Sequence, residues 1–236
     1  MDTSFTSEQK KILLLTGLGG ALEFYDFIIF VFFAKTLGTL FFPNTDPFAS
    51  LMASWTFVAV GYLARPLGGM ILGHLGDRFG RKRSFIVTLI GMAVPSFLIG
   101  LLPSYQAIGL YAPVLLVICR LCQGFFMGGE LPGALVFITE LTPQNKRAWV
   151  CSLIFLGVNA GSLLGSFLST WILHHFSVEE LLAWGWRIPF LFGGILGVVG
   201  FYLRRRLNET PFFYHSPETT KTSVFSFKIS IDVLLP

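Results

Sequence analysis

The sequence predicts an all-α integral membrane protein, built as a bundle of six membrane-spanning helices. Only 13% of its 236 residues are charged and 53% are hydrophobic, whereas soluble domains usually carry about 25% charged residues. The apolar residues also gather in runs of roughly 20, the length at which a helix crosses a hydrocarbon core of about 30 Å. Composition and run length together argue against an ordinary soluble domain.

Six apolar runs account for the six helices, in the order 12–34, 51–72, 85–102, 111–137, 149–173 and 188–203. Each run is continuously apolar, without the polar–apolar alternation of outer-membrane strands, so its backbone is expected to bond internally as a helix. The first run follows Lys10 and Lys11 as a signal peptide would. It exceeds the usual apolar region of about 7–15 residues and contains Glu23 and Asp26, so we expect it to remain as a span.

Basic residues fall on one side of the predicted bundle. The loops 43–48, 103–109 and 174–185 contain no Lys or Arg. The positive-inside rule therefore predicts that both termini are cytoplasmic. Because the basic residues are scattered over several segments, no nucleic-acid partner is expected, and the net charge of +4 is interpreted as a topology signal. The basic residues of the cytoplasmic side are Lys10, Lys11, Arg78, Arg81, Lys82, Arg83, Lys146, Arg147, Arg204, Arg205 and Arg206.

Two motif-like patterns are not expected to bind a metal or cofactor. Cys119 and Cys122 form a C-x-x-C pattern, but they lie within one predicted span without a histidine beside them, so packing is the better explanation. The stretch GLGGAL at 17–22 lacks the third glycine and the preceding strand of a dinucleotide loop. No nucleophile or metal-ligand spacing accompanies the histidines, and we expect no enzyme activity.

The stretch GHLGDRFGRKR at 73–83 forms a short turn between the second and third spans. Its glycines allow two helix ends to approach, and Asp77 is an acid in the most basic loop. A local ion pair with Arg78 or Arg81 would contribute little by itself. We therefore predict a gating loop that consists of Gly73, Asp77, Arg78, Gly80 and Arg81.

This stretch resembles the signature loop of the major facilitator superfamily, G-x-x-x-D-R-x-G-R-K/R. The stretches ALEFYDF (21–27), ARPLGG (64–69), RLCQGFFMGGE (120–130), WGWRIPF (184–190) and LRRRLNETPFF (203–213) are similar to its metabolite:proton symporters. The resemblance implies proton-coupled transport, in a bacterial inner membrane, of a small polar metabolite such as proline, betaine or an organic acid.

The family has twelve spans in two halves, and six are predicted here. The resemblance therefore implies the amino-terminal half of a twelve-helix fold. On this interpretation the chain divides into a cytoplasmic N-terminus (1–11), the bundle (12–204) and the truncated start of a central cytoplasmic loop (205–236). The expected partners are the substrate, protons, the lipid bilayer and a second six-helix half. The alternatives are a membrane subunit for binding or assembly without a transport cycle, and a non-functional gene remnant.

Five charged residues lie inside the predicted spans: Glu23, Asp26, Arg65, Arg120 and Glu130. Each costs at least a few kcal/mol near the middle of a bilayer, so we predict that they line the proton and substrate pathway. Glu23, Asp26 and Arg120 are expected near the midplane, where transporters bind substrates and coupling ions. Either an acid beside Arg120 carries the proton, or fixed ion pairs (Asp26 with Arg120, Arg65 with Glu130) brace the bundle.

Two further groups are expected to serve packing and anchoring. Gly157, Gly161 and Gly165 repeat every four residues and form one smooth helix face for close packing. The resemblance implies that this fifth span lies along the interface between the two halves. Trp184 and Trp186 are expected to anchor the sixth span at the outer membrane interface.

Overall fold

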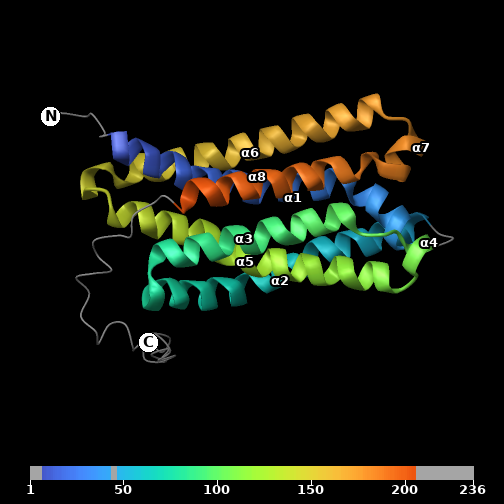
Figure 1. Ribbon diagram of the computed structural model, residues 1–236, viewed down its shortest axis with the longest axis horizontal. Coiled ribbons are helices and arrows are strands. Elements are labelled where there is room, and N and C mark those ends of the chain that lie inside the picture. Colours follow the sequence, from blue (N-terminus) through green and yellow to red (C-terminus); the bar gives the residue numbers. More distant parts are fainter. Residues whose placement is uncertain (1–6, 44–46, 206–236) are drawn as a thin grey trace, which may run out of the picture.

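The computed structural model describes residues 7–43 and 47–205, and over these residues it is helical without strands. The six long helices are α1 (Ser7–Phe41), α2 (Pro47–Phe79), α3 (Arg81–Leu101), α5 (Tyr111–Glu140), α6 (Arg147–His175) and α8 (Arg187–Arg204). They run side by side along one axis (Figure 1). The short elements are α4 (Tyr105–Ile108), the 3₁₀ turn η1 (Gln144–Lys146), α7 (Val178–Glu180) and the π-helical turn η2 (Leu181–Gly185). The predicted all-α class is confirmed.

In the described part of the chain, five helical segments are long and apolar enough to cross a membrane: Leu13–Phe41, Arg81–Leu101, Tyr111–Glu140, Gln144–His175 and Val178–Arg204. The remaining long helix, α2, is not among these five. It has 33 residues and packs lengthwise on α5 within the same bundle. The second predicted span, 51–72, is therefore supported by the packing of α2 within the bundle and not by its hydropathy.

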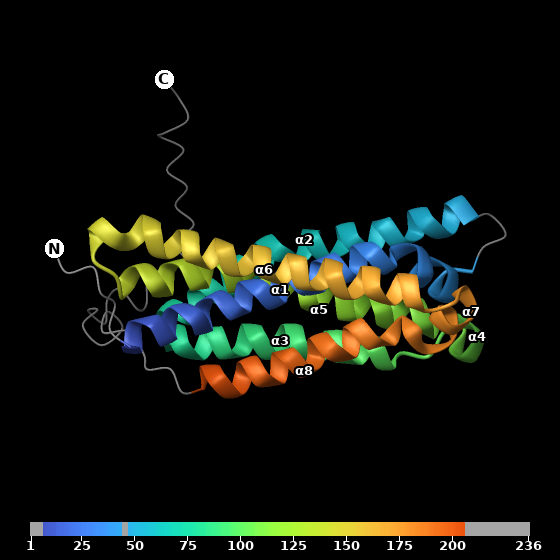
Figure 2. The ribbon, with the colours of Figure 1, turned by 90° about the horizontal axis from the view of Figure 1, so that it is seen from above.

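The helices pack chiefly in three pairs, α1 with α6, α2 with α5 and α3 with α8. Figure 2 shows α1 and α5 in the middle, with α2 and α6 on one side and α3 and α8 on the other. Four of the five charged residues predicted within the spans lie on these two central helices, and Arg65 lies on α2. Their position surrounds them with protein, which lowers the cost of placing charge in an apolar medium.

Small residues let the paired helices approach closely. A Cβ atom on Gly161 of α6 would overlap the carbonyl oxygen of Ala21 on α1, and one on Gly124 of α5 would overlap the carbonyl oxygen of Gly61 on α2. Gly157 and Gly165 also turn toward α1. The glycine face of α6 is thus occupied inside the bundle.

The loops on the two sides of the bundle differ in charge, as the sequence indicates. The junctions α2–α3 and α5–α6 and the carboxyl end of α8 lie together at one end, called here the basic end (Figure 1). The basic residues of these junctions and of the carboxyl end of α8 are Arg78, Arg81, Lys82, Arg83, Lys146, Arg147, Arg204 and Arg205. Residues 1–6 and, apart from Arg205, the predicted loop 205–236 lie outside the described residues.

Opposite the basic end, an aromatic core closes the bundle. Phe41 of α1 and Phe190 of α8 both pack on Trp186, with ring centroids 5.6 Å and 6.2 Å from its indole. Trp186 is only 1% exposed, whereas Trp184 is half exposed. The expectation that both tryptophans anchor at the interface is therefore wrong for Trp186, because the chain after η2 turns its side chain into the core.

Candidate functional site

The candidate site begins with a buried carboxylate, Asp26, on the central helix α1. Its Oδ2 accepts hydrogen bonds from the hydroxyl of Ser96 on α3 and, at 3.3 Å, from Nε2 of Gln123 on α5. Nε2 of Gln123 also lies 2.7 Å from Oγ of Ser96, and its Oε1 accepts a 2.9 Å hydrogen bond from Nη1 of Arg120. Asp26 and Arg120 are therefore linked through an amide group and not by the direct ion pair expected of a brace.

Arg120 and Gln123 lie three residues apart on α5 and so share a helix face. The guanidinium carbon of Arg120 lies 3.4 Å from the ring centroid of Phe30 on α1, and the face of an aromatic ring attracts a cation. Nε of Arg120 has no hydrogen-bond partner among the described residues. Phe30 thus supports this cation without neutralising it.

Glu23, one turn before Asp26 on α1, forms a direct ion pair with Arg65 of α2, with 3.3 Å between Oε1 and Nη2. Arg65 also lies over the ring of Tyr62, 4.3 Å from its centroid. Glu23 is 2% exposed, whereas the Arg65 side chain is 22% exposed and reaches the surface of the bundle. The two acids of α1 therefore differ in environment, since Glu23 has a direct counter-charge and Asp26 has hydrogen-bond donors.

Between α1, α2 and α5 a small cavity adjoins both arginines. Its volume of about 10 Å³ corresponds to at most one water molecule. A whole metabolite does not fit there, but a single polar group of a larger ligand could. The lining residues are Phe27, Val58, Gly61, Tyr62, Arg65, Arg120, Gly124 and Met127.

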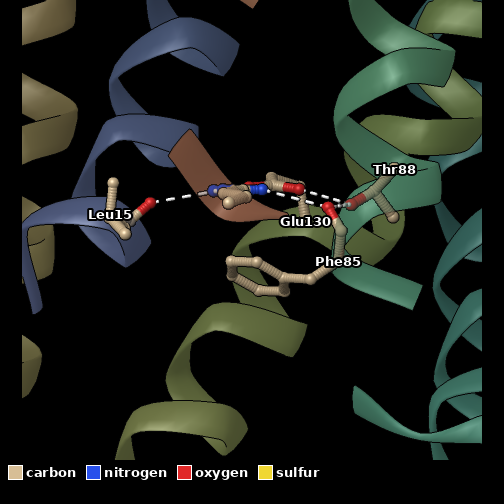
Figure 3. Close-up of polar contacts among 5 residues, drawn as sticks. Leu15, Phe85, Thr88 and Glu130 are labelled. Carbon is tan, nitrogen blue, oxygen red and sulfur yellow. Dashed lines mark hydrogen bonds and ion pairs between the residues drawn. The ribbon is translucent and has the colours of Figure 1, made fainter. Parts of the chain in front are cut away.

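A second buried cluster centres on Glu130 (Figure 3). It lies closer to the basic end, because it includes Arg204 at the carboxyl end of α8. Its Oε1 lies 2.5 Å from Nη2 of Arg204, and its Oε2 accepts a 2.5 Å hydrogen bond from the hydroxyl of Thr88. Arg204 also donates to the carbonyl oxygens of Leu15 at 3.2 Å and Phe85 at 3.1 Å. Arg204 and Glu130 are 1% and 0% exposed, so the carboxyl end of α8 is tied to α1, α3 and α5 in the interior.

The expected pair between Arg65 and Glu130 is therefore wrong. Both residues lie inside predicted spans, but the position along a span does not define which side of a helix a residue occupies. Arg65 turns toward Glu23 and Glu130 turns toward Arg204. Arg204, expected among the loop cations, is instead on the buried face of α8, in register with Gly193, Gly197 and Gly200.

The predicted gating loop forms the α2–α3 junction at the basic end. Arg81 pairs with Asp77 at 2.6 Å and with Glu140 of α5 at 3.5 Å, so the loop is connected to a third helix. Gly80 has a φ of 103°, a conformation that other residues rarely adopt. Gly73 does not fit the expected close approach, because a Cβ atom there would have no neighbour within 4 Å.

The family model for sugar (and other) transporters matches residues 12–226. The chain belongs to this family. The predicted membership of the major facilitator superfamily is confirmed, as is the prediction that the protein is not an enzyme, because the sugar (and other) transporter family consists of transporters.

Several curated transporters are similar to this family member. The chain is 42% identical over 204 residues to the proline/betaine transporter of Salmonella typhimurium, covering 86% of the chain and 41% of that protein. A glycine betaine/proline/ectoine/pipecolic acid transporter of Dickeya dadantii shows the same identity and coverage. A putative proline/betaine transporter of Staphylococcus haemolyticus is 39% identical, with 89% of the chain and 45% of that protein covered. The chain thus spans less than half the length of these relatives.

Solved structures support the fold. The proton:xylose symporter XylE bound to 6-bromo-6-deoxy-D-glucose superposes with a TM-score of 0.80 at 21% identity, covering 92% of this chain and 49% of XylE. The partially occluded inward-open form of XylE from E. coli gives a TM-score of 0.80 at 20% identity, covering 97% and 54%. The arrangement of helices is therefore that of one half of a major facilitator transporter.

Sequence reasoning missed several polar members of the two clusters. Ser96 and Gln123 are uncharged residues inside apolar runs, and Thr88 is another. Each has a hydrogen-bonding side chain inside a predicted span, and such a group is costly to place in lipid unless it has a hydrogen-bond partner. That cost is the feature of the sequence that could have identified them. Counting only charged residues left these three unrecognised.

Proposed function

We propose that the chain forms one six-helix half of a proton-coupled symporter for a small polar metabolite such as proline, betaine or an organic acid. The observation that carries the proposal is the network in which the buried Asp26 is joined through Gln123 to Arg120. The relatives that transport proline and betaine support the choice of substrate.

Asp26 is the better candidate for the proton-binding group than Glu23. Its Oδ2 is bound only by neutral donors, and its Oδ1, like Oε2 of Glu23, has no hydrogen-bond partner among the described residues. Protonation of Asp26 therefore breaks no direct ion pair, whereas protonation of Glu23 would leave Arg65 without its direct counter-charge. We assign Asp26 to proton binding and the Glu23–Arg65 pair to bracing within the same pathway.

Substrate would bind between this half and a second six-helix half. Transporters of this kind bind substrate near the midplane, at the interface of their repeats. The cavity beside Arg65 and Arg120 is too small for a metabolite and supplies only part of such a site. In this proposal the basic end faces the cytoplasm of a bacterium and the bundle lies in the inner membrane.

The loop of Gly73, Asp77, Arg78, Gly80 and Arg81 would act as a gate at the cytoplasmic end. Arg81 contacts both Asp77 and Glu140, so breaking these contacts would release α2 and α3 from α5. The Glu130–Arg204 pair lies deeper than this loop. It would keep α1, α3, α5 and α8 together while the loop opens.

The test joins residues 1–213 to the second half of the Salmonella proline/betaine transporter and measures uptake in proteoliposomes. Asp26→Asn should abolish proline uptake driven by a pH gradient while exchange of proline across the membrane survives. Glu23→Gln is the matched control: it weakens a brace and should retain gradient-driven uptake. Unchanged gradient-driven uptake in Asp26→Asn would overturn the assignment of Asp26. Selective loss of gradient-driven uptake in Glu23→Gln would transfer the role to Glu23.

A further inference from the structure

Gln123 is buried to 2% exposure at the centre of the bundle, and the proposal above uses it only as the contact that joins Asp26 to Arg120. A carboxylate only accepts hydrogen bonds and a guanidinium only donates them. The amide of Gln123 therefore satisfies both neighbours in one orientation, with its NH₂ toward Asp26 and its oxygen toward Arg120. The side chain is a polar link between an acid and a base that do not touch directly.

The charges around Asp26 come from three helices. Glu23 lies on α1 and Arg65 on α2, and these two neutralise each other in a direct ion pair. Among the described residues, the remaining charged group near Asp26 is Arg120 of α5, which is linked to it through Gln123. Among the described residues, α3 contributes the neutral Ser96 and α8 contributes Gly193, whose Cβ position lies 2.9 Å from Oδ1 of Asp26. Arg120 therefore depends on Asp26 for its counter-charge.

We propose that Gln123 is a positioning residue that transmits the charge of Asp26 to Arg120, so that protonation of Asp26 frees Arg120 to bind an anionic group of the substrate, such as a carboxylate. This inference rests on the proposed proton-binding role of Asp26 and extends it to a named link and a substrate chemistry.

The steps balance in charge. A hydronium ion from the solution transfers its proton to Oδ1 of Asp26, the oxygen without a described partner, so that the carboxylate becomes a neutral acid and a water molecule is left. Hydrogen bonds to a neutral acceptor are roughly half as strong as those to an ionised one. The hydrogen bond from the Gln123 amide to Asp26 therefore weakens. Arg120 then carries an uncompensated buried charge, which is costly. A substrate carboxylate that places one oxygen atom in the adjoining cavity, which Arg120 lines, restores neutrality.

The first test uses the purified 236-residue chain in nanodiscs and infrared difference spectra between neutral and acidic pH. We expect an Asp26 carboxyl band, assigned by its loss in Asp26→Asn, together with a guanidinium change assigned by its loss in Arg120→Lys. In Gln123→Leu the carboxyl band should remain while the guanidinium change disappears. A guanidinium change that persists in Gln123→Leu overturns the link. Absence of the Asp26 band in the wild-type chain overturns the proposed proton-binding role instead.

The second test measures substrate affinity in the fusion with the Salmonella second half. Wild-type affinity for proline should be about tenfold higher at acidic than at alkaline pH, the effect expected for one hydrogen-bonded charge. Gln123→Leu should flatten this difference, so that the affinity measured at acidic pH falls to the alkaline value. Cys119→Ala, a buried change on the same helix, should keep the wild-type pH dependence. A Gln123→Leu fusion whose affinity depends on pH as in the wild type would show that Gln123 is only a packing residue.

Discussion

Glu130 and Arg204 illustrate at the residue scale how this bundle accommodates charge in its interior. Each is enclosed, and their mutual contact is supplemented by the hydroxyl of Thr88 and two backbone carbonyl oxygens. A buried ion pair of this kind is not by itself a large source of stability, but removal of one partner leaves the other uncompensated. The pair therefore constrains which helices meet at this depth.

Removing one member of that pair should destabilise the bundle more than removing both. We expect Arg204→Met to lower the free energy of unfolding by about 3–5 kcal/mol, since it leaves Glu130 buried without its cation. The double variant Glu130→Gln/Arg204→Met should recover part of this loss. Thermal unfolding in detergent, followed by helical circular dichroism, measures both. A single variant as stable as the wild type would show that this contact is dispensable.

Asp77 allows a residue-scale test of the gate. Asp77→Asn weakens the 2.6 Å contact with Arg81 outside the substrate cavity. In the fusion with a second half we expect a lower maximal rate with little change in substrate affinity. Arg83→Gln, an exposed change on the neighbouring α3, serves as the control. A large loss of affinity at normal rate would point to a binding role for Asp77.

At the scale of single helices, close packing depends on positions without a side chain. Gly161→Leu should separate α6 from α1, because the new side chain meets the backbone of Ala21. Overpacking of this kind typically costs about 1–3 kcal/mol. Ala160→Leu, on the exposed side of α6, should cost much less. Unfolding midpoints of the two variants give the comparison, and equal stability would contradict the observed α1–α6 packing.

The existence and approximate bounds of the helices could be predicted because run length and hydropathy are local properties. Neighbouring helices could not be assigned in this way, since hydropathy does not define the direction in which a residue points. This is why Arg65 was paired with Glu130 and why Arg204 was placed among the loop cations. Gln123 was missed because the role of an uncharged amide in an apolar run depends on which residues it contacts, and the sequence does not give these contacts.

For the whole molecule, the distribution of basic residues predicts the orientation. Arg205 directly follows α8, whose carboxyl end lies at the basic end (Figure 1). Because basic loops face the cytoplasm, a reporter that works only in the cytosol should be active when it is fused after Arg205. The matched fusion at Ser104, in the loop between α3 and α4 at the opposite end, should favour a periplasmic reporter. Periplasmic activity after Arg205 would reverse the proposed orientation.

The central claim is that these six helices form one half of a two-half transport site. The bundle supplies Asp26, Gln123 and Arg120 from one side only, and its adjoining cavity has room for at most one water molecule.

The most direct measurement is proton-driven uptake of proline, betaine, citrate and α-ketoglutarate into proteoliposomes. It compares the 236-residue chain alone with the chain joined to a second half. We predict no saturable uptake by the chain alone and gradient-driven uptake of at least one of these compounds by the joined protein. Robust saturable uptake by the 236-residue chain alone would contradict the account.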